Sequence, residues 1–160
     1  MKIKVGFGFD VHPLQEGKEL WLGGIKLNHT KGAVGHSDAD VLIHAICDAL
    51  LGAAGLRDIG YYFPNTSSEF KNIDSKILLK RVIELLEKKN CIVGNLDCSL
   101  VLEEPKINPH IEAMKEALAP ILKIEKSDIS IKATTNEKLG YVGREEGVCA
   151  YAVVLLEKNY

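Results

Sequence analysis

Two side chains that can bind a metal ion stand two residues apart in the stretch FGFDVHP, residues 7–13: Asp10 and His12. The residues before them alternate in a way that predicts a strand, which would bury Phe7 and Phe9 and stop at Pro13. Side chains two apart on a strand point to the same face, roughly 6 to 7 Å apart along the chain. The carboxylate and the imidazole can therefore converge on one ligand, as half of a metal site.

A third candidate ligand, His44, lies in GHSDADVLIHAICDALLG, where apolar residues surround a polar line of Asp40, His44 and Asp48. Residues four apart stack on one helix face, so a buried polar line needs a partner. A lone histidine there would most simply be a core histidine bonded to Asp40 or Asp48. Together with Asp10 and His12, it forms a two-histidine, one-carboxylate set that can hold zinc and leave a fourth position open, as in catalytic zinc sites. Asp40 or Asp48 would then orient the imidazole from behind.

Two loops carry further polar groups. RDIGYYFPN, residues 57–65, places a charged pair, a glycine and three aromatic residues between two helices. KATTNEKLGYVGREEG, residues 132–147, follows a strand with two adjacent threonines, Glu137, glycines and an arginine. Hydroxyls, backbone amides and a cation near a strand end suit phosphate oxygens, and a glutamate suits a hard cation such as Mg²⁺. Ordinary packed or solvated loops have the same composition.

Composition restricts the function classes. The 160 residues are 46% apolar and 26% charged, with a formal net charge of −2, so no global field attracts nucleic acid or anionic membranes. Anion binding must therefore be local. The N-terminal residues form a strand rather than a signal or transit segment, so we expect a cytoplasmic protein or a trimmed plastid-stroma chain. The cysteines have no paired spacing and lie in apolar segments, which predicts buried free thiols at Cys47, Cys91, Cys98 and Cys149.

Periodicity and capping residues predict one folding unit that begins with β-structure. Ser37 is the expected N-cap of the first helix, which Gly52 and Gly55 stop. Asn108-Pro109 opens the third helix, which Pro120 ends or kinks. The expected strands are 2–9, a hairpin over 19–27, 91–93, 96–103, 129–134 and 148–157, and the expected helices are 41–51, 74–90 and 108–120.

The run from Val148 to Leu156 is apolar throughout, which predicts a central strand covered on both faces. Three amphipathic helices can supply both covers. Alternatively, they lie on one face while other subunits cover the second. The residues alone leave these two arrangements open.

Four separated motifs together carry a family resemblance: FDVH, GHSDADVLIHAICDALLGAAGLRDIGYYFP, LEEPKINPHI and KATTNEKLGYVGREEG. In this order, and over nearly the whole chain, they resemble the 2-C-methyl-D-erythritol 2,4-cyclodiphosphate synthases of the non-mevalonate isoprenoid pathway. The resemblance implies one α/β (α+β) domain over residues 1–160, with a single mixed sheet, helices on one face and a homotrimer that buries the other face. The length resembles that of the free synthase rather than of its fusion with a cytidylyltransferase.

The resemblance also implies a reaction and its metals. A metal-dependent lyase would convert 4-diphosphocytidyl-2-C-methyl-D-erythritol 2-phosphate to the 2,4-cyclodiphosphate and CMP, by attack of the 2-phosphate on the β-phosphate of the same molecule. Zinc would be held by Asp10, His12 and His44, and magnesium or manganese by Glu137. The catalytic set would be His36, Asp58, Thr135 and Glu137.

Further positions match the family's substrate contacts, in active sites between subunits. The methylerythritol phosphate would contact His36, Ser37, Asp58, Gly60, Phe63 and Asn65. The cytidine pocket would run from Leu102 to Asn108, with Pro105 and Lys106, and the phosphates would contact Ala133, Thr134 and Thr135. A cavity on the trimer axis, which can hold an isoprenoid diphosphate in the family, would be lined by Phe9, Tyr141, Arg144 and Glu146.

Three residues depart from the family pattern. Asn65 stands where Asp is common, Tyr141 replaces a usual Phe, and Ala39 stands where Gly is frequent, which should favour the helix. Two rival functions use the same residues. One is a zinc-dependent phosphohydrolase that releases CMP and an open diphosphate, and the other is a trimeric module that only binds isoprenoid diphosphates.

Overall fold

The longest strand, β1 (Lys2–Glu16), contacts two partners along its length. In the computed structural model, which describes residues 1–158, β1 pairs antiparallel with β7 (Gly147–Lys158) along most of its length. It then pairs antiparallel with β4 (Lys31–Ala33). The prediction that Pro13 ends this strand is wrong. Pro13 is the last residue paired with β7, and its carbonyl still accepts a hydrogen bond from Val34 N–H at 2.9 Å.

The sheet has five strands in the order β4-β1-β7-β5-β6. β5 (Cys91–Val101) runs antiparallel to β7, and β6 (Ile129–Thr134) runs parallel to β5, so the sheet is mixed as predicted. The two strands predicted over 91–103 are instead one strand, β5, because an irregularity between Val93 and Asn95 leaves Gly94 unpaired without ending the ladder.

The predicted hairpin is confirmed as a separate two-stranded sheet of β2 (Leu20–Leu22) and β3 (Ile25–Leu27). Its turn residues Gly23 and Gly24 have φ angles of 61° and 81°, which only glycine adopts without strain.

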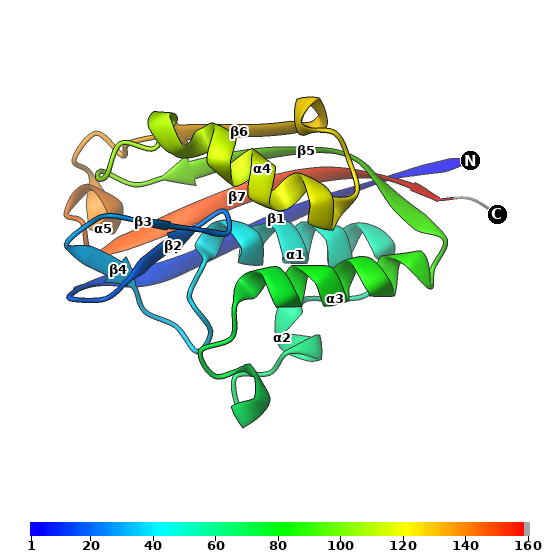
Figure 1. Cartoon of the computed structure of the whole chain (residues 1–160), viewed down its shortest axis with the longest axis horizontal. Helices are drawn as coiled ribbons and strands as arrows, with labels where there is room; N and C mark the ends of the chain where they lie inside the picture. Colours follow the sequence, from blue (N-terminus) through cyan, green and yellow to red (C-terminus); the bar gives the residue numbers. More distant parts are fainter. Residues whose placement is uncertain (159–160) are drawn as a thin grey trace.

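Three helices, α1, α3 and α4, lie over one face of the five-stranded sheet (Figure 1). The bounds of the longer helices are Val41–Ala54 for α1, Ser75–Glu87 for α3 and Ile111–Leu122 for α4. Shorter helical segments are α2 (Ile59–Tyr62), α5 (Gly140–Gly143) and the 3-10 turns Ser68–Phe70, Asn108–His110 and Lys126–Asp128. The third predicted helix thus starts with a 3-10 turn at Asn108, and Pro120 lies inside α4 rather than at its end.

Glycines let α1 lie directly on β1. A Cβ atom on Gly6 would lie 1.9 Å from the carbonyl oxygen of Ala49, and one on Gly8 would lie 1.9 Å from that of Ala45. No side chain fits at either position, so the helix backbone and the strand backbone are in contact. Because alternate strand residues share a face, Gly6 and Gly8 place the next side chains of the same face, beginning with Asp10, toward α1.

The other residues of β1 face away from the helices. Ile3, Val5, Phe7, Phe9 and Val11 have exposed fractions between 40% and 66%. The prediction that the chain buries Phe7 and Phe9 is therefore wrong, because alternation identifies the side chains that share a face but not the face that meets the helices.

β7 is central in the sheet, but the chain covers only one of its faces. Tyr151 and Val153 are 40% and 44% exposed. Ala152, which lies between them, and Val154, which follows Val153, are buried. Of the two arrangements that the sequence leaves open, the structure contradicts the one in which the chain's own helices cover both faces of this strand. The outward face is instead a continuous apolar surface of β1 and β7.

The N-cap of α1 is Asp40, so the prediction of Ser37 as the cap is wrong. The fully buried Asp40 carboxylate accepts the N–H of Ile43 at 3.1 Å, as an N-cap does. It also accepts the N–H groups of Gly23 at 3.0 Å and Gly24 at 2.7 Å, which ties the β2–β3 turn to the start of the helix.

Ala39 precedes the helix and has a φ angle of 57°, in the left-handed region. The expectation that Ala39 favours the helix is wrong. The high helix propensity of alanine stabilises only positions inside a helix, and alanine is less suited than glycine to a left-handed conformation.

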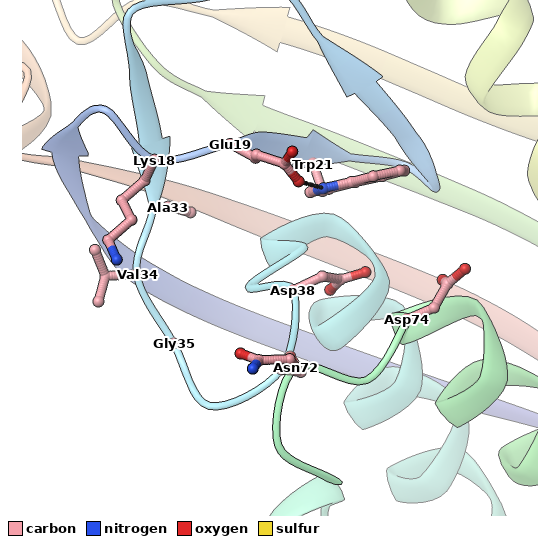
Figure 2. Close-up of a pocket in the computed structure, with 10 residues that line it drawn as sticks. Lys18, Glu19, Trp21, Ala33, Val34, Gly35, Asp38, Asn72 and Asp74 are labelled. Carbon is pink, nitrogen blue, oxygen red and sulfur yellow. Dashed lines mark hydrogen bonds between the residues drawn. The ribbon is translucent and has the colours of Figure 1, made fainter.

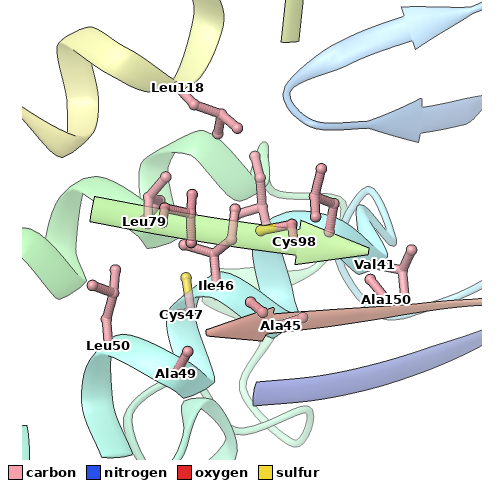
Figure 3. Close-up of a cluster of buried hydrophobic side chains, with 14 of the residues drawn as sticks. Val41, Ala45, Ile46, Cys47, Ala49, Leu50, Leu79, Cys98, Leu118 and Ala150 are labelled. Carbon is pink, nitrogen blue, oxygen red and sulfur yellow. The ribbon is translucent and has the colours of Figure 1, made fainter. Parts of the chain in front are cut away.

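The core lies between the helices and the inward face of the sheet. Figure 3 shows Ile46 and Leu50 of α1 beside Leu79 of α3 and Cys98 of β5, with Leu118 of α4 above them. The predicted free thiols are confirmed, since Cys47, Cys91, Cys98 and Cys149 are all buried and unpaired with one another.

The contact of β1 with α1 can be tested with one methyl group. We expect Gly8→Ala to lower the free energy of unfolding by at least about 2 kcal/mol, because the methyl group meets helix backbone that cannot move aside. Denaturant unfolding measures this change. Gly52→Ala is the matched control, since no atom lies within 4 Å of its added Cβ. Inside α1 this change should instead stabilise the protein by about 0.5 to 1 kcal/mol. Similar effects of the two changes would contradict this account.

Candidate functional site

Asp10, His12 and His44 converge in the lining of a cavity. The Asp10 Oδ2 atom lies 3.0 Å from His12 Nε2 and 3.0 Å from His44 Nδ1, and the two ring nitrogens are also 3.0 Å apart. Asp10 and His12 come from β1, and His44 comes from the second turn of α1. The three ligand atoms predicted from the residue spacing therefore form a nearly equilateral triangle.

This triangle fits a metal ion. Ligand atoms bound at 2.0 to 2.2 Å to a tetrahedral zinc lie roughly 3.3 Å apart, close to the separations found. The three residues, each partly buried, are a set whose atoms can hold one ion. Three protein ligands leave the fourth coordination position open for a ligand from the cavity. In a purely structural zinc site, four protein ligands occupy all the positions.

A backbone carbonyl orients His12. Its Nδ1 atom lies 3.0 Å from the carbonyl oxygen of Val34, the residue after β4. Because a carbonyl only accepts, Nδ1 must carry a proton, so in the uncharged ring Nε2 keeps the lone pair that faces Asp10.

In the metal-free protein, charges within the triad shift the pKa values of Asp10 and His12. Burial raises the pKa of the Asp10 carboxyl, but hydrogen bonds and charge interactions with His12 and His44 lower it by more, to about 2. Burial lowers the pKa of His12, but the hydrogen bond and the charge of Asp10, together with the Val34 carbonyl and the charge of Asp40, raise it by more, so the net shift is upward from 6.5. The metal-free site thus favours a carboxylate beside a protonated imidazole.

Serine hydroxyls, not aspartates, lie behind His44. The Oγ atoms of Ser37 and Ser75 are each 3.0 Å from His44 Nε2. The prediction that Asp40 or Asp48 orients this imidazole is wrong. The Asp40 carboxylate binds backbone N–H groups of the hairpin and of α1, and the Asp48 carboxylate accepts the N–H of Ile59 at 2.7 Å, which ties α2 to α1.

The cavity beside the triad has a volume of about 310 Å³. It brings together many of the predicted substrate contacts: the lining includes His36, Ser37, Gly60, Phe63 and Asn65 with the triad. Predicted residue Asp58 is not in this lining. Its carboxylate caps α2 by accepting the N–H of Tyr61 at 3.0 Å, next to Gly60 in the chain.

A second cavity, of about 130 Å³, lies where β5 and β6 end. Its lining contains the predicted cytidine and phosphate contacts Leu102, Pro105, Lys106, Ala133, Thr134 and Thr135. The two cavities have no lining residue in common. The chain therefore presents two sets of the predicted contacts rather than one.

The loop after β6 carries the remaining predicted residues outside both cavities. Glu137 is exposed, with a φ angle of 52°. Tyr141 lies in α5, and Arg144, which caps this short helix, forms an ion pair with Glu146. Sequence reasoning missed the anchor of this loop. The buried Glu103 carboxylate accepts the N–H groups of Asn136 at 3.0 Å and Lys138 at 3.2 Å.

A third cavity, of about 410 Å³, lies on the other side of the loop that carries Ser37. Figure 2 shows Trp21 and Glu19 on one side of it and Asn72 and Asp74 on the other, with Asp38 between them. Sequence reasoning assigned no role to these residues.

A mixed α/β fold with two imidazoles and a carboxylate converging beside a cavity defines a candidate metal-binding enzyme. The sequence profile of the YgbB family matches residues 3–157. A curated protein of Bacteroides thetaiotaomicron is 64% identical over 99% of this chain and 100% of its own length, and one of Cytophaga hutchinsonii is 66% identical over 99% of both. Both are named 2-C-methyl-D-erythritol 2,4-cyclodiphosphate synthase.

Solved structures agree with this match. The bifunctional IspDF of Campylobacter jejuni has a TM-score of 0.94 at 40% identity, covering 99% of this chain and 43% of that protein. The CDP complex of Plasmodium falciparum IspF has a TM-score of 0.86 at 37% identity, covering 98% of this chain and 97% of that one. The chain belongs to the YgbB family, the family of the 2-C-methyl-D-erythritol 2,4-cyclodiphosphate synthases, and is an enzyme of this kind. The resemblance inferred from the four motifs is confirmed.

Within residues 1–158, every helix is too short or too polar to cross a membrane.

The ion pair within the triad can be measured in chelated protein. We expect an NMR titration of His12 to give a pKa above 6.5, and Asp10→Asn to lower this pKa, because the hydrogen bond and the charge of Asp10, which oppose the effect of burial, are then lost. Since only the unprotonated imidazole binds a metal, zinc affinity of the wild type should rise with pH through this pKa. Asp48→Asn is the control and should leave the His12 titration unchanged. An unchanged titration in Asp10→Asn would contradict the assigned cause.

Proposed function

We propose that the chain converts 4-diphosphocytidyl-2-C-methyl-D-erythritol 2-phosphate to 2-C-methyl-D-erythritol 2,4-cyclodiphosphate and CMP, as a metal-dependent lyase. Family membership supports the reaction. The observation that carries the metal dependence is the triangle of Asp10, His12 and His44 in the lining of the larger predicted substrate cavity.

The reaction needs no nucleophile from the protein. An oxygen of the 2-phosphate forms a bond to the β-phosphorus, and the bond between that phosphorus and the oxygen bridging it to CMP breaks, which closes the ring. The second pKa of a phosphate monoester is about 6, so the attacking group is already mostly dianionic at neutral pH. The chain's task is to fold the substrate so that attack is effectively unimolecular, which can lower a barrier by about 7 to 11 kcal/mol in the best cases.

Mutual repulsion of the phosphates is the main obstacle, and several of the chain's nearby cations are already paired with carboxylates. The basic side chains around the second cavity and the loop after β6 include three that are already paired with carboxylates: Lys132 with Asp97, Lys138 with Glu103 and Arg144 with Glu146. Positive charge must therefore come from a source other than these three residues. Asp10, His12 and His44 would hold zinc, and Glu137 would hold magnesium or manganese. When bound, these ions act as Lewis acids and templates that neutralise the phosphate oxygens.

The remaining predicted residues bind and orient the substrate. His36, Ser37, Asp58, Gly60, Phe63 and Asn65 would hold the methylerythritol phosphate, and Asn65 would contribute an amide rather than a carboxylate contact. Leu102, Pro105 and Lys106 would enclose the cytidine, while Ala133, Thr134 and Thr135 contact the phosphates. A relative solved as a CDP complex supports a cytidine nucleotide as a ligand of this chain. The groups proposed to act on the reacting phosphates are His36, Asp58, Thr135 and Glu137.

A homotrimer, with active sites between subunits, would join the two sets of contacts. The support is the apolar outward face of β1 and β7, where Val5 and Phe7 are 66% and 63% exposed in the single chain. Such a surface is typical of an interface. On the trimer axis, Phe9, Tyr141, Arg144 and Glu146 would line a cavity that holds an isoprenoid diphosphate.

Phosphorus NMR tests the reaction. With substrate, zinc and magnesium, we expect a coupled pair of signals from a cyclic diphosphate together with CMP, and neither after chelation. His44→Ala should lose zinc and lower turnover by at least about 100-fold, because a group that stabilises transition-state charge is removed. Glu137→Ala should keep zinc but respond weakly to magnesium.

His29→Ala, which removes a histidine outside the triad, is the matched control and should keep both zinc and turnover. CMP with an open diphosphate would support the phosphohydrolase instead. Binding of an isoprenoid diphosphate without any turnover would support the binding module. Full zinc occupancy in His44→Ala would remove this residue from the ligand set.

Sedimentation tests the assembly. We expect the wild type to sediment as a trimer and Phe7→Asp as a monomer that keeps zinc but loses turnover, because each active site would need a neighbouring subunit. Ile77→Asp is the control, since Ile77 is 46% exposed on α3, away from the sheet face. A Phe7→Asp variant that remains trimeric would refute this interface.

A further inference from the structure

Ser75, the first residue of α3, connects a candidate metal ligand to a carboxylate outside the ligand set. It is fully buried, and its Oγ lies 3.0 Å from Nε2 of His44. The same hydroxyl is hydrogen-bonded to Oδ1 of Asp38, and the backbone N–H of Ser75 donates to Oδ2 of Asp38 at 2.8 Å. Asp38, Ser75 and His44 thus form a continuous series of hydrogen bonds that ends at the triad.

The single proton of the Ser75 hydroxyl determines which group donates in each of these hydrogen bonds. An ionised carboxylate only accepts hydrogen bonds, so Ser75 donates its proton to Asp38. The oxygen of Ser75 then offers only lone pairs to His44, and Nε2 of His44 must supply the proton of that hydrogen bond. Nδ1 of His44 keeps its lone pair on the side where Asp10 and His12 converge.

Asp38 is itself fixed by backbone groups. Its carboxylate accepts the N–H of Asp40 at 3.1 Å, and its own N–H donates to the carbonyl of Ile73 at 3.0 Å. These bonds join the segment before α1 to the segment before α3. The carboxylate therefore cannot turn away from Ser75 without breaking several hydrogen bonds.

Ser37 lies equally close to His44 Nε2 but does not determine which of the two groups donates the hydrogen bond. Its oxygen accepts the N–H of Ala39 at 3.2 Å, and within residues 1–158 no carboxylate is hydrogen-bonded to its hydroxyl. It also lines the cavity beside the triad, so its proton is free to turn toward a ligand there.

We propose that Asp38 and Ser75 are positioning residues that hold His44 in the tautomer able to bind a metal ion through Nδ1. The inference rests on the proposed metal-dependent function and extends it to two residues outside the ligand set. Groups that orient a metal ligand from behind typically change metal affinity by 10- to 100-fold when they are removed.

Zinc affinity in two variants tests the proposal. Ser75→Ala removes the acceptor for His44 Nε2–H, and Asp38→Asn introduces an amide donor where the present contacts need only acceptors. We expect both to bind zinc about 10- to 100-fold more weakly, measured by competition with a chromophoric chelator. Asp74→Asn is the matched control. It removes the same charge one residue from Ser75 but keeps an N-cap acceptor, so its zinc affinity should stay within about twofold of the wild type.

Nitrogen NMR of the imidazole supplies a readout that needs neither metal nor turnover. In chelated wild-type protein, with His44 uncharged, we expect its proton on Nε2. In Ser75→Ala and Asp38→Asn, the proton should move toward Nδ1, where Asp10 can accept it. A purely structural role would lower thermal stability and leave both the tautomer and the zinc affinity unchanged.

Either of two results would overturn the proposal: unchanged zinc affinity in both variants, or a wild-type His44 protonated on Nδ1. If Ser75→Ala does not fold, the Asp38→Asn variant and the wild-type spectrum still test the proposal. A wild-type protein that binds no zinc through His44 would instead defeat the proposed function, whereas the tautomer is measured without metal.

Discussion

The backbone contact between β1 and α1 is the constraint on which the site depends. Gly6 and Gly8 admit no side chain, so the strand and helix lie as close as their main chains allow. At this separation Asp10 and His12 of the strand reach the first turns of the helix, where His44 lies 3.0 Å from Asp10. Larger residues at the two glycines would push the helix outward and separate the two halves of the triangle.

Each imidazole of the triangle is oriented by an element other than its own. His12 belongs to β1 but is held by the carbonyl of Val34 after β4, and His44 belongs to α1 but contacts Ser75 of α3. The two rings therefore face each other with different nitrogens, Nε2 of His12 and Nδ1 of His44. Sites built on packed strands and helices in this way keep their geometry better than sites built on loops.

Much of the site follows from the sequence, because its signals are local. The two-residue spacing of Asp10 and His12, and the polar line through His44, each report a side-chain direction within one element. Ser75 gave no such signal, since it lies 31 residues from His44 and only tertiary packing brings them together. The face of β1 was predicted wrongly for a related reason. The alternating apolar residues mark one face, but the glycines between them, which identify the face against α1, look unremarkable until the helix is in place.

β1 thus encodes two surfaces in alternate residues. One set, from Gly6 through His12, belongs to the helix contact and the triad, and the other, from Ile3 through Val11, forms the apolar outer face. The insertion or deletion of a single residue within this strand would exchange the two sets, turning phenylalanines toward α1 and carrying the glycines outward. A substitution in this segment affects the one surface to which its residue belongs, whereas a change in length by one residue damages both surfaces.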